Sequence, residues 1–219
     1  MAAITLKNVQ LGANALNLAI GDREFVVLTG PVGCGNSTIL RLIAGLENAP
    51  QGDIHLGERH INGVSPEDRD VALVAQAYAP YPDMSVHENL AFALKRRRFA
   101  ETEIKKRVLA VAEILGLQEQ LSQQPHLLSS EERQFMALAR AMVLQPKVFL
   151  FDNPFSTLGP EARRRARAEI KKLHQRMPAT MIYATQDPTE ALALGERTVV
   201  LDKGIVQQDG EAQSLYDAP

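Results

Sequence analysis

Cysteine and tryptophan are scarce in this sequence. Its 219 residues contain one cysteine, Cys34, and no tryptophan, and only 5% of them are aromatic. A single cysteine cannot form an internal disulfide, and Cys34 has no Cys or His neighbour at a metal-ligand spacing. The five histidines are scattered along the chain. We therefore predict neither a disulfide nor a structural metal site.

Long apolar runs and an excess of positive charge are missing as well. The longest apolar runs, such as residues 71–74 and 199–201, are far shorter than the roughly 18 residues of a membrane-spanning helix. The N-terminus lacks a signal-peptide pattern. Lys and Arg number 24 against 26 Asp and Glu, giving a formal charge of -2, so no basic field draws the chain to nucleic acid. We expect a cytoplasmic chain without a nucleic-acid partner.

The patterning that is present predicts an α/β fold. Short β-type runs alternate with longer helical ones, which favours a largely parallel sheet with helices between its strands. Strand signals disappear after Tyr81, so we expect a helical subdomain at about residues 81–143. We predict strands at residues 4–9, 25–29, 53–56, 71–75, 148–151, 180–183, 198–201 and 205–208, and helices at 37–44, 86–95, 101–115, 131–143, 160–175 and 189–194.

Two predicted helices begin with a capping box, in which a serine and a glutamate three residues later satisfy free N–H groups at the helix start. These are Ser85 with Glu88 and Ser129 with Glu132. The charge runs at 95–98 and 163–165 lie on predicted helices with acidic neighbours. We interpret both runs as solvated helix faces.

A glycine-rich loop follows the strand at 25–29 and leads into an apolar helix. It reads Gly30-Pro-Val-Gly33-Cys34-Gly35-Asn36-Ser37-Thr38. In a P-loop of this kind, backbone N–H groups surround a phosphate and the helix N-terminus adds partial positive charge. Ser37 occupies the place of the Mg²⁺-binding hydroxyl, but Asn36 stands where the pattern requires lysine. A charge pair about 4 Å apart is worth on the order of 4 kcal/mol before desolvation, so the loss of the lysine should weaken phosphate binding. From this segment alone, a tight strand-to-helix connection that binds no phosphate is an equal alternative.

Further motifs follow the loop in a fixed order. They are Val74-Ala-Gln76, Tyr81-Pro-x-Met-Ser-Val-x-Glu-Asn89, Leu128-Ser129, Ala137-Leu-Ala-Arg-Ala141, Pro146-Lys-Val-Phe-Leu-Phe-Asp152 and Met181-Ile-Tyr-Ala-Thr-x-Asp187. From about residue 4 to 219 the chain resembles the nucleotide-binding domain of ABC transporters, most like the sugar-importer ATPases. The resemblance implies a P-loop NTPase (RecA-like) core with an antiparallel β subdomain and a helical signature subdomain. It implies one nucleotide-binding domain over residues 1–219, without the C-terminal regulatory domain of many such subunits.

The resemblance also implies a ligand and partners. In such domains Mg-ATP lies between the P-loop of one subunit and the signature motif of another, so a homodimer or an ABC-type heterodimer is expected. The region Gln76 to Asn89 matches the part that docks on a transmembrane permease, which would hold the chain at the inner membrane face. Nucleotide-binding candidates are Gly30, Gly33, Cys34, Gly35, Asn36, Ser37, Thr38, Gln76 and Asp152, of which Ser37, Gln76 and Asp152 would hold Mg²⁺.

Several positions that carry chemistry in this family differ. In addition to Asn36 in the loop, three residues differ from the family pattern. Asn153 stands where the family has its catalytic glutamate, Gln186 where it has the switch histidine, and Gly159 where it has the D-loop aspartate. An amide cannot take a proton as a general base. The signature Leu-Ser-Gly-Gly-Gln appears as Leu128 followed by Ser129, Ser130, Glu131 and Glu132, and no aromatic residue precedes Phe25 to stack on adenine.

These replacements lead to one expectation and two alternatives. We expect a catalytically degenerate ATP-binding domain that lacks ATP hydrolysis and binds Mg-ATP weakly or not at all. The first alternative is an active ATP-hydrolysing subunit of an ABC importer. The second is a structural scaffold without a ligand.

Overall fold

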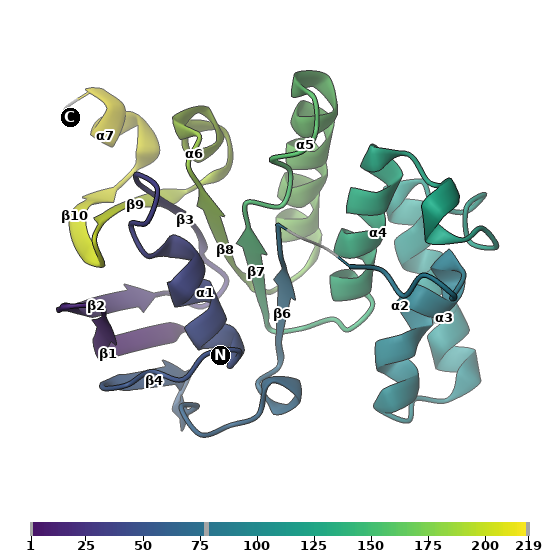
Figure 1. The fold of residues 1–219 in the computed structure, drawn as a ribbon, viewed down its shortest axis with the longest axis horizontal. Helices are drawn as coiled ribbons and strands as arrows, with labels where there is room; N and C mark the ends of the chain where they lie inside the picture. Colours follow the sequence, from purple (N-terminus) through teal and green to yellow (C-terminus); the bar gives the residue numbers. More distant parts are fainter. Residues whose placement is uncertain (1, 77–78, 218–219) are drawn as a thin grey trace. The chain divides into compact units, whose positions relative to one another are not determined.

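The structure is a computed structural model that describes residues 2–76 and 79–217. The chain forms two compact units. The first contains Met1–Leu73, Lys147–Asn153 and Ile170–Pro219, and the second contains Val74–Pro146 and Pro154–Glu169. The expected α/β architecture is confirmed (Figure 1). No helix in the described part of the chain is long and apolar enough to cross a bilayer.

The first unit contains an antiparallel sheet in the order β2-β1-β4-β5. Its strands are β1 (Ile4–Leu11), β2 (Asn14–Ile20), β4 (Asp53–Leu56) and β5 (Arg59–His60). Strand β2 alternates buried Leu16, Leu18 and Ile20 with exposed residues. Strand β2 was not predicted because its asparagines and alanines have weak β propensity, and β5 was not predicted because it has only two residues.

A six-stranded sheet, in the order β10-β9-β3-β8-β7-β6, contains the other six predicted strands. They are β6 (Val71–Val74), β3 (Phe25–Thr29), β7 (Val148–Asp152), β8 (Thr180–Thr185), β9 (Arg197–Asp202) and β10 (Ile205–Gly210). Strands β9, β3, β8 and β7 run parallel, and β10 pairs antiparallel with β9. The pairs Thr29 with Thr185 and Asp152 with Ala184 bring the carboxyl ends of β3, β7 and β8 to one edge.

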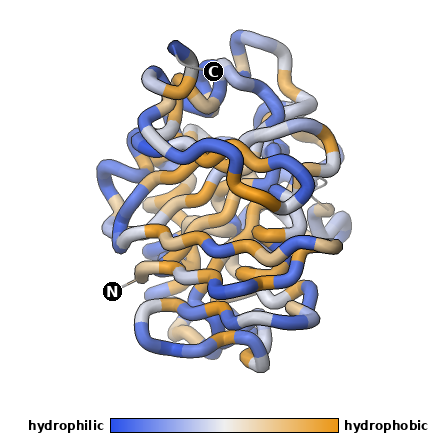
Figure 2. Tube along the Cα trace, turned by 90° about the vertical axis from the view of Figure 1, so that its left-hand side faces the viewer, coloured by the Kyte–Doolittle hydropathy of each residue, from blue (hydrophilic) through white to orange (hydrophobic). Residues whose placement is uncertain are grey.

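Helix α1 (Asn36–Ala44) lies between the two sheets of the first unit (Figure 1). Its buried Ile39, Leu40 and Ile43 share a core with alternate residues of β3, such as Val26 and Leu28, and with residues of β1. Figure 2 shows hydrophobic stretches of the chain gathered in the interior, with hydrophilic residues at many of the outer turns. Burial of both faces explains why β3 is a continuous apolar run.

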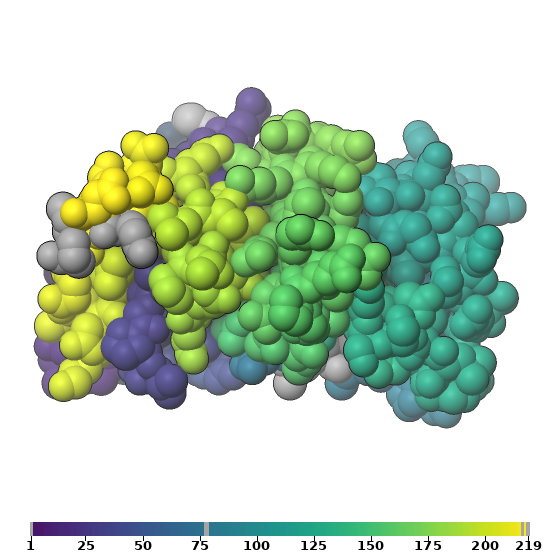
Figure 3. All heavy atoms as spheres, turned by 90° about the horizontal axis from the view of Figure 1, so that it is seen from above, coloured from purple at the N-terminus to yellow at the C-terminus, as the bar shows by residue number. Residues whose placement is uncertain are grey.

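The other face of the six-stranded sheet is covered by helices from the end of the chain. Helix α6 (Pro188–Leu194) packs on β3 and β8, and α7 (Ala212–Asp217) packs on β9 and β10. Figure 3 shows α6 and α7 neighbouring each other at the surface, in yellow-green and yellow. Phe149, Phe151 and Tyr183 form an aromatic cluster in the sheet, with neighbouring ring centroids 6.0 and 5.9 Å apart. Helix α7 was not predicted.

The second unit is helical, as the missing strand signals predicted. It contains α2 (Val86–Arg96), α3 (Glu101–Leu115), a 3₁₀ turn (Pro125–Leu127) and α4 (Ser130–Met142), and α5 (Pro160–Arg176) begins in it and ends in the first unit. Both predicted capping boxes are confirmed. The side chains of Ser85 and Ser129 accept hydrogen bonds from the N–H groups of Glu88 and Glu132, each at 3.2 Å.

Candidate functional site

The loop after β3 takes a backbone course that needs glycine. Gly30 has φ 155°, and a Cβ at this position would lie 2.1 Å from the carbonyl oxygen of Leu201. Gly35 has φ 109° and occupies the N-cap of α1, a left-handed conformation that strains other residues. Between them the Cys34 N–H donates to the Pro31 oxygen at 3.0 Å. The loop thus curls at the positively polarised start of α1, a setting that suits a phosphate.

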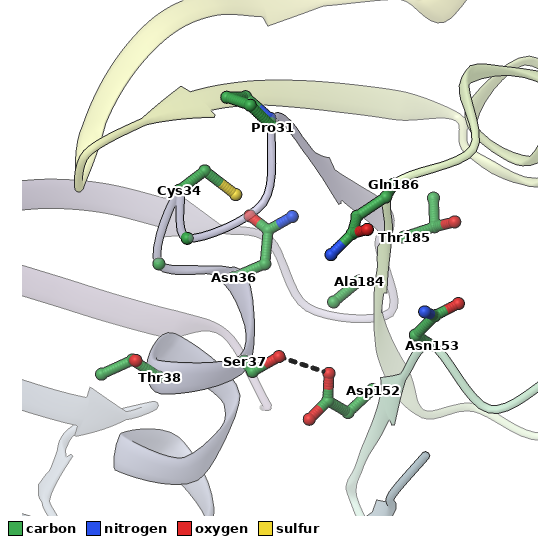
Figure 4. Close-up of a pocket in the computed structure, with 12 residues that line it drawn as sticks. Pro31, Cys34, Asn36, Ser37, Thr38, Asp152, Asn153, Ala184, Thr185 and Gln186 are labelled. Atoms are coloured by element: carbon green, nitrogen blue, oxygen red, sulfur yellow. Dashed lines mark hydrogen bonds between the residues drawn. The ribbon is translucent and has the colours of Figure 1, made fainter. Parts of the chain in front are cut away.

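A cavity of about 140 Å³ opens at this loop (Figure 4). We call it the loop cavity. Its walls come from three segments of the first unit: the loop with the first turn of α1, the end of β7, and the end of β8. The lining residues are Pro31, Gly33, Cys34, Gly35, Asn36, Ser37, Thr38, Asp152, Asn153, Ala184, Thr185 and Gln186.

Ser37 and Asp152, two of the three residues that the sequence offers as Mg²⁺ ligands, meet within this cavity. The Ser37 Oγ donates to Asp152 Oδ1 at 2.7 Å, and Figure 4 shows the bond bridging α1 and β7. Asp152 is 6% exposed and ends a strand buried along its whole length. A hydroxyl and a carboxylate side by side form a donor set that suits a hard cation such as Mg²⁺. The residues present therefore fit this ion.

Asn36 is buried at the position where the P-loop pattern requires lysine. Its side chain is 7% exposed, and its Nδ2 donates to the Leu28 oxygen at 3.2 Å. Its Oδ1 is buried and has no hydrogen-bond partner in the described residues. The amide therefore ties the start of α1 to β3, and an uncharged group takes the place of a cation.

Asn153 and Gln186 also line the loop cavity, so the structure brings together two of the replaced catalytic positions. Asn153 follows β7 with a positive φ of 45°, and its N–H donates to the Ala184 oxygen at 2.9 Å. Asparagine tolerates this left-handed conformation better than most residues. Both side chains end in amides, which can orient a water molecule by hydrogen bonding without taking its proton.

Other predicted site residues lie elsewhere. Gly30 lies close to the Leu201 oxygen, and neither it nor Gln76 is among the described residues that line the cavity. Gln76 belongs to the second unit, as does Gly159, which precedes α5. Within the predicted docking region from Gln76 to Asn89, residues 77 and 78 lie outside the described part of the chain.

The signature remnant forms the first turn of α4 in the second unit. Ser129 is the N-cap, and Ser130, Glu131 and Glu132 follow it. Hydrogen bonds from the Ser129 side chain and backbone lower the pKa of the Glu132 carboxyl. Glu131 pairs with Arg165 of α5 at 2.8 Å. The two carboxylates are thus held in contacts within their own unit.

A second, larger cavity of about 370 Å³ was not predicted from the sequence. We call it the hairpin cavity, because the β1–β2 turn and the β9–β10 turn form it together with the glycine loop. It is lined by Leu11, Gly12, Ala13, Asn14, Gly33, Cys34, Gly35, Thr38, Lys203 and Gly204. Gly204 is a turn signal, but nothing local indicates that this turn meets the glycine loop.

Comparison with known proteins identifies relatives of the whole chain. The family described as ABC transporter matches residues 13–156. The oligosaccharides import ATP-binding protein MsmX of Bacillus subtilis is 50% identical over 93% of this chain and 56% of its own length. The sn-glycerol-3-phosphate import ATP-binding protein UgpC of Chromobacterium violaceum is 45% identical over all of this chain and 61% of its own length. The chain therefore spans about three fifths of these relatives.

Solved structures show the same fold. The ATP-binding cassette MJ0796, in a dimeric post-hydrolysis state bound to ADP and Pi, superposes with a TM-score of 0.84 at 26% identity. The match covers 95% of this chain and 98% of that one. A second dimeric structure of MJ0796, a bacterial ABC transporter cassette, gives the same TM-score at 27% identity.

These findings contradict the expectation of a degenerate domain without ATP hydrolysis. Relatives at 45 to 50% identity are named import ATP-binding proteins, which supports the alternative of an active ATPase subunit. The expectation weighed single replaced side chains. It gave less weight to the elements of the site that remain, namely the glycine loop, the start of α1 and the Ser37–Asp152 pair, which it took to support weak binding at most. The resemblance noted in the sequence is confirmed: the chain belongs to the ABC transporter family.

Proposed function

We propose that this chain is an ATP-binding and ATP-hydrolysing subunit of an ABC importer for a sugar or a related small solute. The observation that carries the proposal is the Ser37–Asp152 hydrogen bond of 2.7 Å at the glycine loop. It places two oxygen ligands for Mg²⁺ beside a loop of the kind that binds phosphate. The printed names of MsmX and UgpC, which are import ATP-binding proteins, support the kind of transport.

Each element of the loop cavity has a role in this proposal. The N–H groups of the loop and the start of α1 bind the phosphate chain. Ser37 and Asp152 hold Mg²⁺, which neutralises developing charge on the phosphate oxygens when bound. Because Asn36 carries no charge, the backbone and the metal ligands supply more of the binding free energy than they would beside a lysine.

Asn153 and Gln186 orient the attacking water through their amides. Neither group can accept its proton, so acceleration comes from positioning and from electrostatic stabilisation by the loop. In phosphoryl transfer these two effects account for most of the catalysis. We therefore expect turnover that is measurable and slower than a carboxylate at position 153 would give.

The proposal includes two kinds of partner. A second ABC-type subunit, in a homodimer or a heterodimer, would bring the start of its α4, with Ser129 and Ser130, to the nucleotide. The dimeric state of the MJ0796 cassette bound to ADP and Pi supports this arrangement. A membrane permease would dock on the region from Gln76 to Asn89 and hold the chain at the cytoplasmic face of the membrane.

Hydrolysis and assembly can be tested on the purified chain. Phosphate release from ATP should depend on Mg²⁺ and disappear in Asp152→Ala, while Glu58→Ala, which removes an exposed carboxylate at the β4–β5 turn, should keep the wild-type rate. Light scattering should show a rise in mass from monomer to dimer with Mg-ATP. Absence of phosphate release, or equal release by Asp152→Ala, would contradict the proposal.

A further inference from the structure

Positive charge is concentrated where α2 is joined to α3. Residues 95–106 contain six Lys and Arg against two Glu, whereas the whole chain has a formal charge of -2. All six cationic residues are exposed. We call this group the basic surface, and its members are Lys95, Arg96, Arg97, Arg98, Lys105 and Lys106.

The end of α2 and the start of α3 bring these cations together. The two helices pack against each other (Figure 1), and the Arg98 N–H closes the turn between them by donating to the Lys95 oxygen at 2.9 Å. The Lys95 Nζ lies 3.8 Å from the Glu101 Oε1. Lys105 follows Glu101 by four residues and so lies beside it on α3. Cations of both helices therefore share one surface.

The two carboxylates of the segment neutralise little of this charge. Glu103 is bonded to Arg107, which lies outside the basic surface, at 2.6 Å. Glu101 is 79% exposed at its side chain and lies at the long distance given above from Lys95, so water weakens that attraction. A group of cations that lacks compensating charge attracts a surface of negative charge.

An exposed leucine continues the same face of α3. Leu109 follows Lys105 by four residues and is 44% exposed. An apolar side chain next to cations is typical of protein surfaces that lie on a bilayer, where the cations contact anionic lipids and the hydrocarbon enters the boundary between headgroups and acyl chains.

The basic surface is less suited to nucleic acid. Single-stranded nucleic acid binds to aromatic rings that stack on its bases. Phe99, the aromatic residue within this segment, is half-buried, and the Arg107 guanidinium covers its ring at 4.6 Å from the centroid. The surface can therefore recognise phosphate charge but offers no free ring to a base.

The proposed docking on a permease would bring the basic surface near a membrane. The docking region from Gln76 to Asn89 ends in the first turn of α2, and the basic surface begins in the last turn of that helix. Helix α2 has 11 residues and is therefore about 16 Å long. This step rests on the proposed function.

We propose that the basic surface binds the anionic headgroups of a bilayer and that Leu109 enters the boundary between the headgroups and the acyl chains. The contact is a second attachment of the chain to a membrane, beside that to the permease. It requires neither a permease nor a nucleotide, so it can be measured on the chain alone.

Co-sedimentation of the full chain with lipid vesicles tests the proposal. The vesicles contain phosphatidylcholine alone or with about 30% phosphatidylglycerol, which supplies the negative charge. In about 0.1 M NaCl the chain should sediment with the anionic vesicles and stay in solution with the neutral ones. Binding should weaken at least about tenfold in about 1 M NaCl, because the screening length falls from about 10 to about 3 Å.

Two results of this experiment would overturn the inference. They are an absence of binding to the anionic vesicles and equal binding to both kinds. Either result leaves the proposed hydrolysis of ATP standing, since the vesicle assay contains no nucleotide. A single-stranded oligonucleotide, added at the same phosphate concentration as the anionic vesicles, should leave the chain bound to them. Transfer of the chain to the oligonucleotide would assign the surface to nucleic acid and overturn the inference as well.

A double substitution locates the contact. Arg96 and Lys105 are exposed and form no ion pair with another described residue, and glutamine has a helix propensity similar to theirs. Arg96→Gln with Lys105→Gln should therefore stay folded. Each cation near an anionic surface contributes about fivefold to the affinity, so the double variant should bind anionic vesicles about 30-fold more weakly.

The matched control is Arg164→Gln with Lys171→Gln. It removes two exposed cations from α5 and so changes the net charge by the same amount. It should bind the anionic vesicles as the wild type does. An equal loss in the two double variants would mean that net charge alone drives binding, and it would overturn the assignment to the basic surface.

Leu109→Gln tests the apolar part of the contact. It should weaken binding to anionic vesicles about fivefold, because a partly buried leucine loses its transfer from water. Leu46→Gln, at a leucine that follows α1 and is 59% exposed, is the control and should bind like the wild type. Equal affinities of Leu109→Gln and the wild type would overturn the proposed entry of Leu109 into the bilayer.

Discussion

The Oγ of Ser37 donates a 2.7 Å hydrogen bond to Oδ1 of Asp152 across 115 positions of sequence. Ser37 lies in the first turn of α1, and Asp152 is the last residue of β7. The bond holds two oxygen atoms that can bind a metal ion beside the glycine loop. Preorganised donors need little rearrangement when charge develops in a reaction.

Removal of the Ser37 hydroxyl tests its role as a Mg²⁺ ligand. In Ser37→Ala, Asp152 keeps its carboxylate, but the neighbouring hydroxyl that would also bind the ion is gone. We therefore expect the enhancement of ATP affinity by Mg²⁺ to be about tenfold smaller than in the wild type, which corresponds to about 1.4 kcal/mol of binding free energy. Calorimetric titrations with ATP in Mg²⁺ and in EDTA measure the enhancement. Ser65→Ala, which removes an exposed hydroxyl bonded to Asp68, is the control. Equal enhancement in Ser37→Ala would show that the hydroxyl does not bind the ion.

A carboxylate at position 153 should accelerate hydrolysis. Asn153→Glu supplies a general base at the loop cavity, and such a group contributes about 10²- to 10⁴-fold, so kcat should rise with little change in KM. Asn153→Gln has the same length and bears the same cost of a positive φ, yet its amide takes no proton. It should therefore stay near the wild-type kcat. Equal rates for the two variants would place the attacking water away from residue 153.

The local part of the site could be predicted from sequence, because a strand, a glycine loop and a helix form one contiguous pattern. Asn36 and Ser37 were therefore expected at the glycine loop, and they line its cavity. Asp152, which also lines it, was expected from a separate motif that the resemblance supplied. The contact between Asn14 and Lys203 joins positions 189 residues apart. No local pattern encodes that contact, so the hairpin cavity was not predicted.

Function was harder to infer than fold for a related physical reason. Replacement of single side chains such as Asn153 and Gln186 says which chemical group is lost. It does not say how much activity the remaining site retains, because the effects of groups that act together are not additive and the remaining groups still contribute when one side chain is lost. The comparison with import ATP-binding relatives therefore corrected the expected loss of hydrolysis.

Arg69 is another feature that the sequence did not reveal. Its side chain is 2% exposed. The guanidinium donates to the oxygens of Leu42 and Ile43, at 2.7 and 3.1 Å, and so caps the end of α1. Two further bonds, at 2.8 and 3.3 Å, go to the oxygens of Val64 and Asn62.

Arg69→Met should therefore destabilise the chain strongly. It keeps most of the volume and removes four hydrogen bonds to carbonyl groups. The Leu42 oxygen keeps the Gly45 N–H as a donor, and each of the other carbonyls that is left buried and unsatisfied costs about 1 to 3 kcal/mol. We expect a loss of about 3 kcal/mol or more in the free energy of unfolding, measured by urea denaturation. Arg59→Met, at an exposed arginine that donates to the Asp68 oxygen, should change stability by less than about 1 kcal/mol. Similar losses in both variants would contradict the buried cap.

The last prediction concerns acid stability and the pair formed by Arg197 and Asp209. Two parallel hydrogen bonds of 2.6 Å join the guanidinium to the carboxylate. Those bonds from Arg197 lower the pKa of Asp209. Arg197 also contacts Glu24 at 3.2 Å and the Ala19 oxygen at 2.9 Å. It thereby links the β9–β10 hairpin to the antiparallel sheet of the same unit.

The sign of the pH effect follows from the lowered pKa. The folded chain binds the Asp209 proton less readily than the unfolded chain, whose aspartates titrate near about 3.9. The stabilisation is therefore full above that value and is lost as the pH falls through the lower folded-state pKa. Because the pair is partly solvent-exposed, we expect about 1 kcal/mol or less at pH 7.

Urea unfolding of the wild type and Asp209→Asn at several pH values checks this. The wild type should be the more stable at pH 7, and the two free energies of unfolding should converge as the pH falls below about 3.9, because protonation removes the same charge that the substitution removes. Asp202→Asn, on the same hairpin, controls for the change in net charge. A difference between wild type and Asp209→Asn that stays constant from pH 7 to the acid limit would mean that the pair stabilises the fold through hydrogen bonding or packing alone.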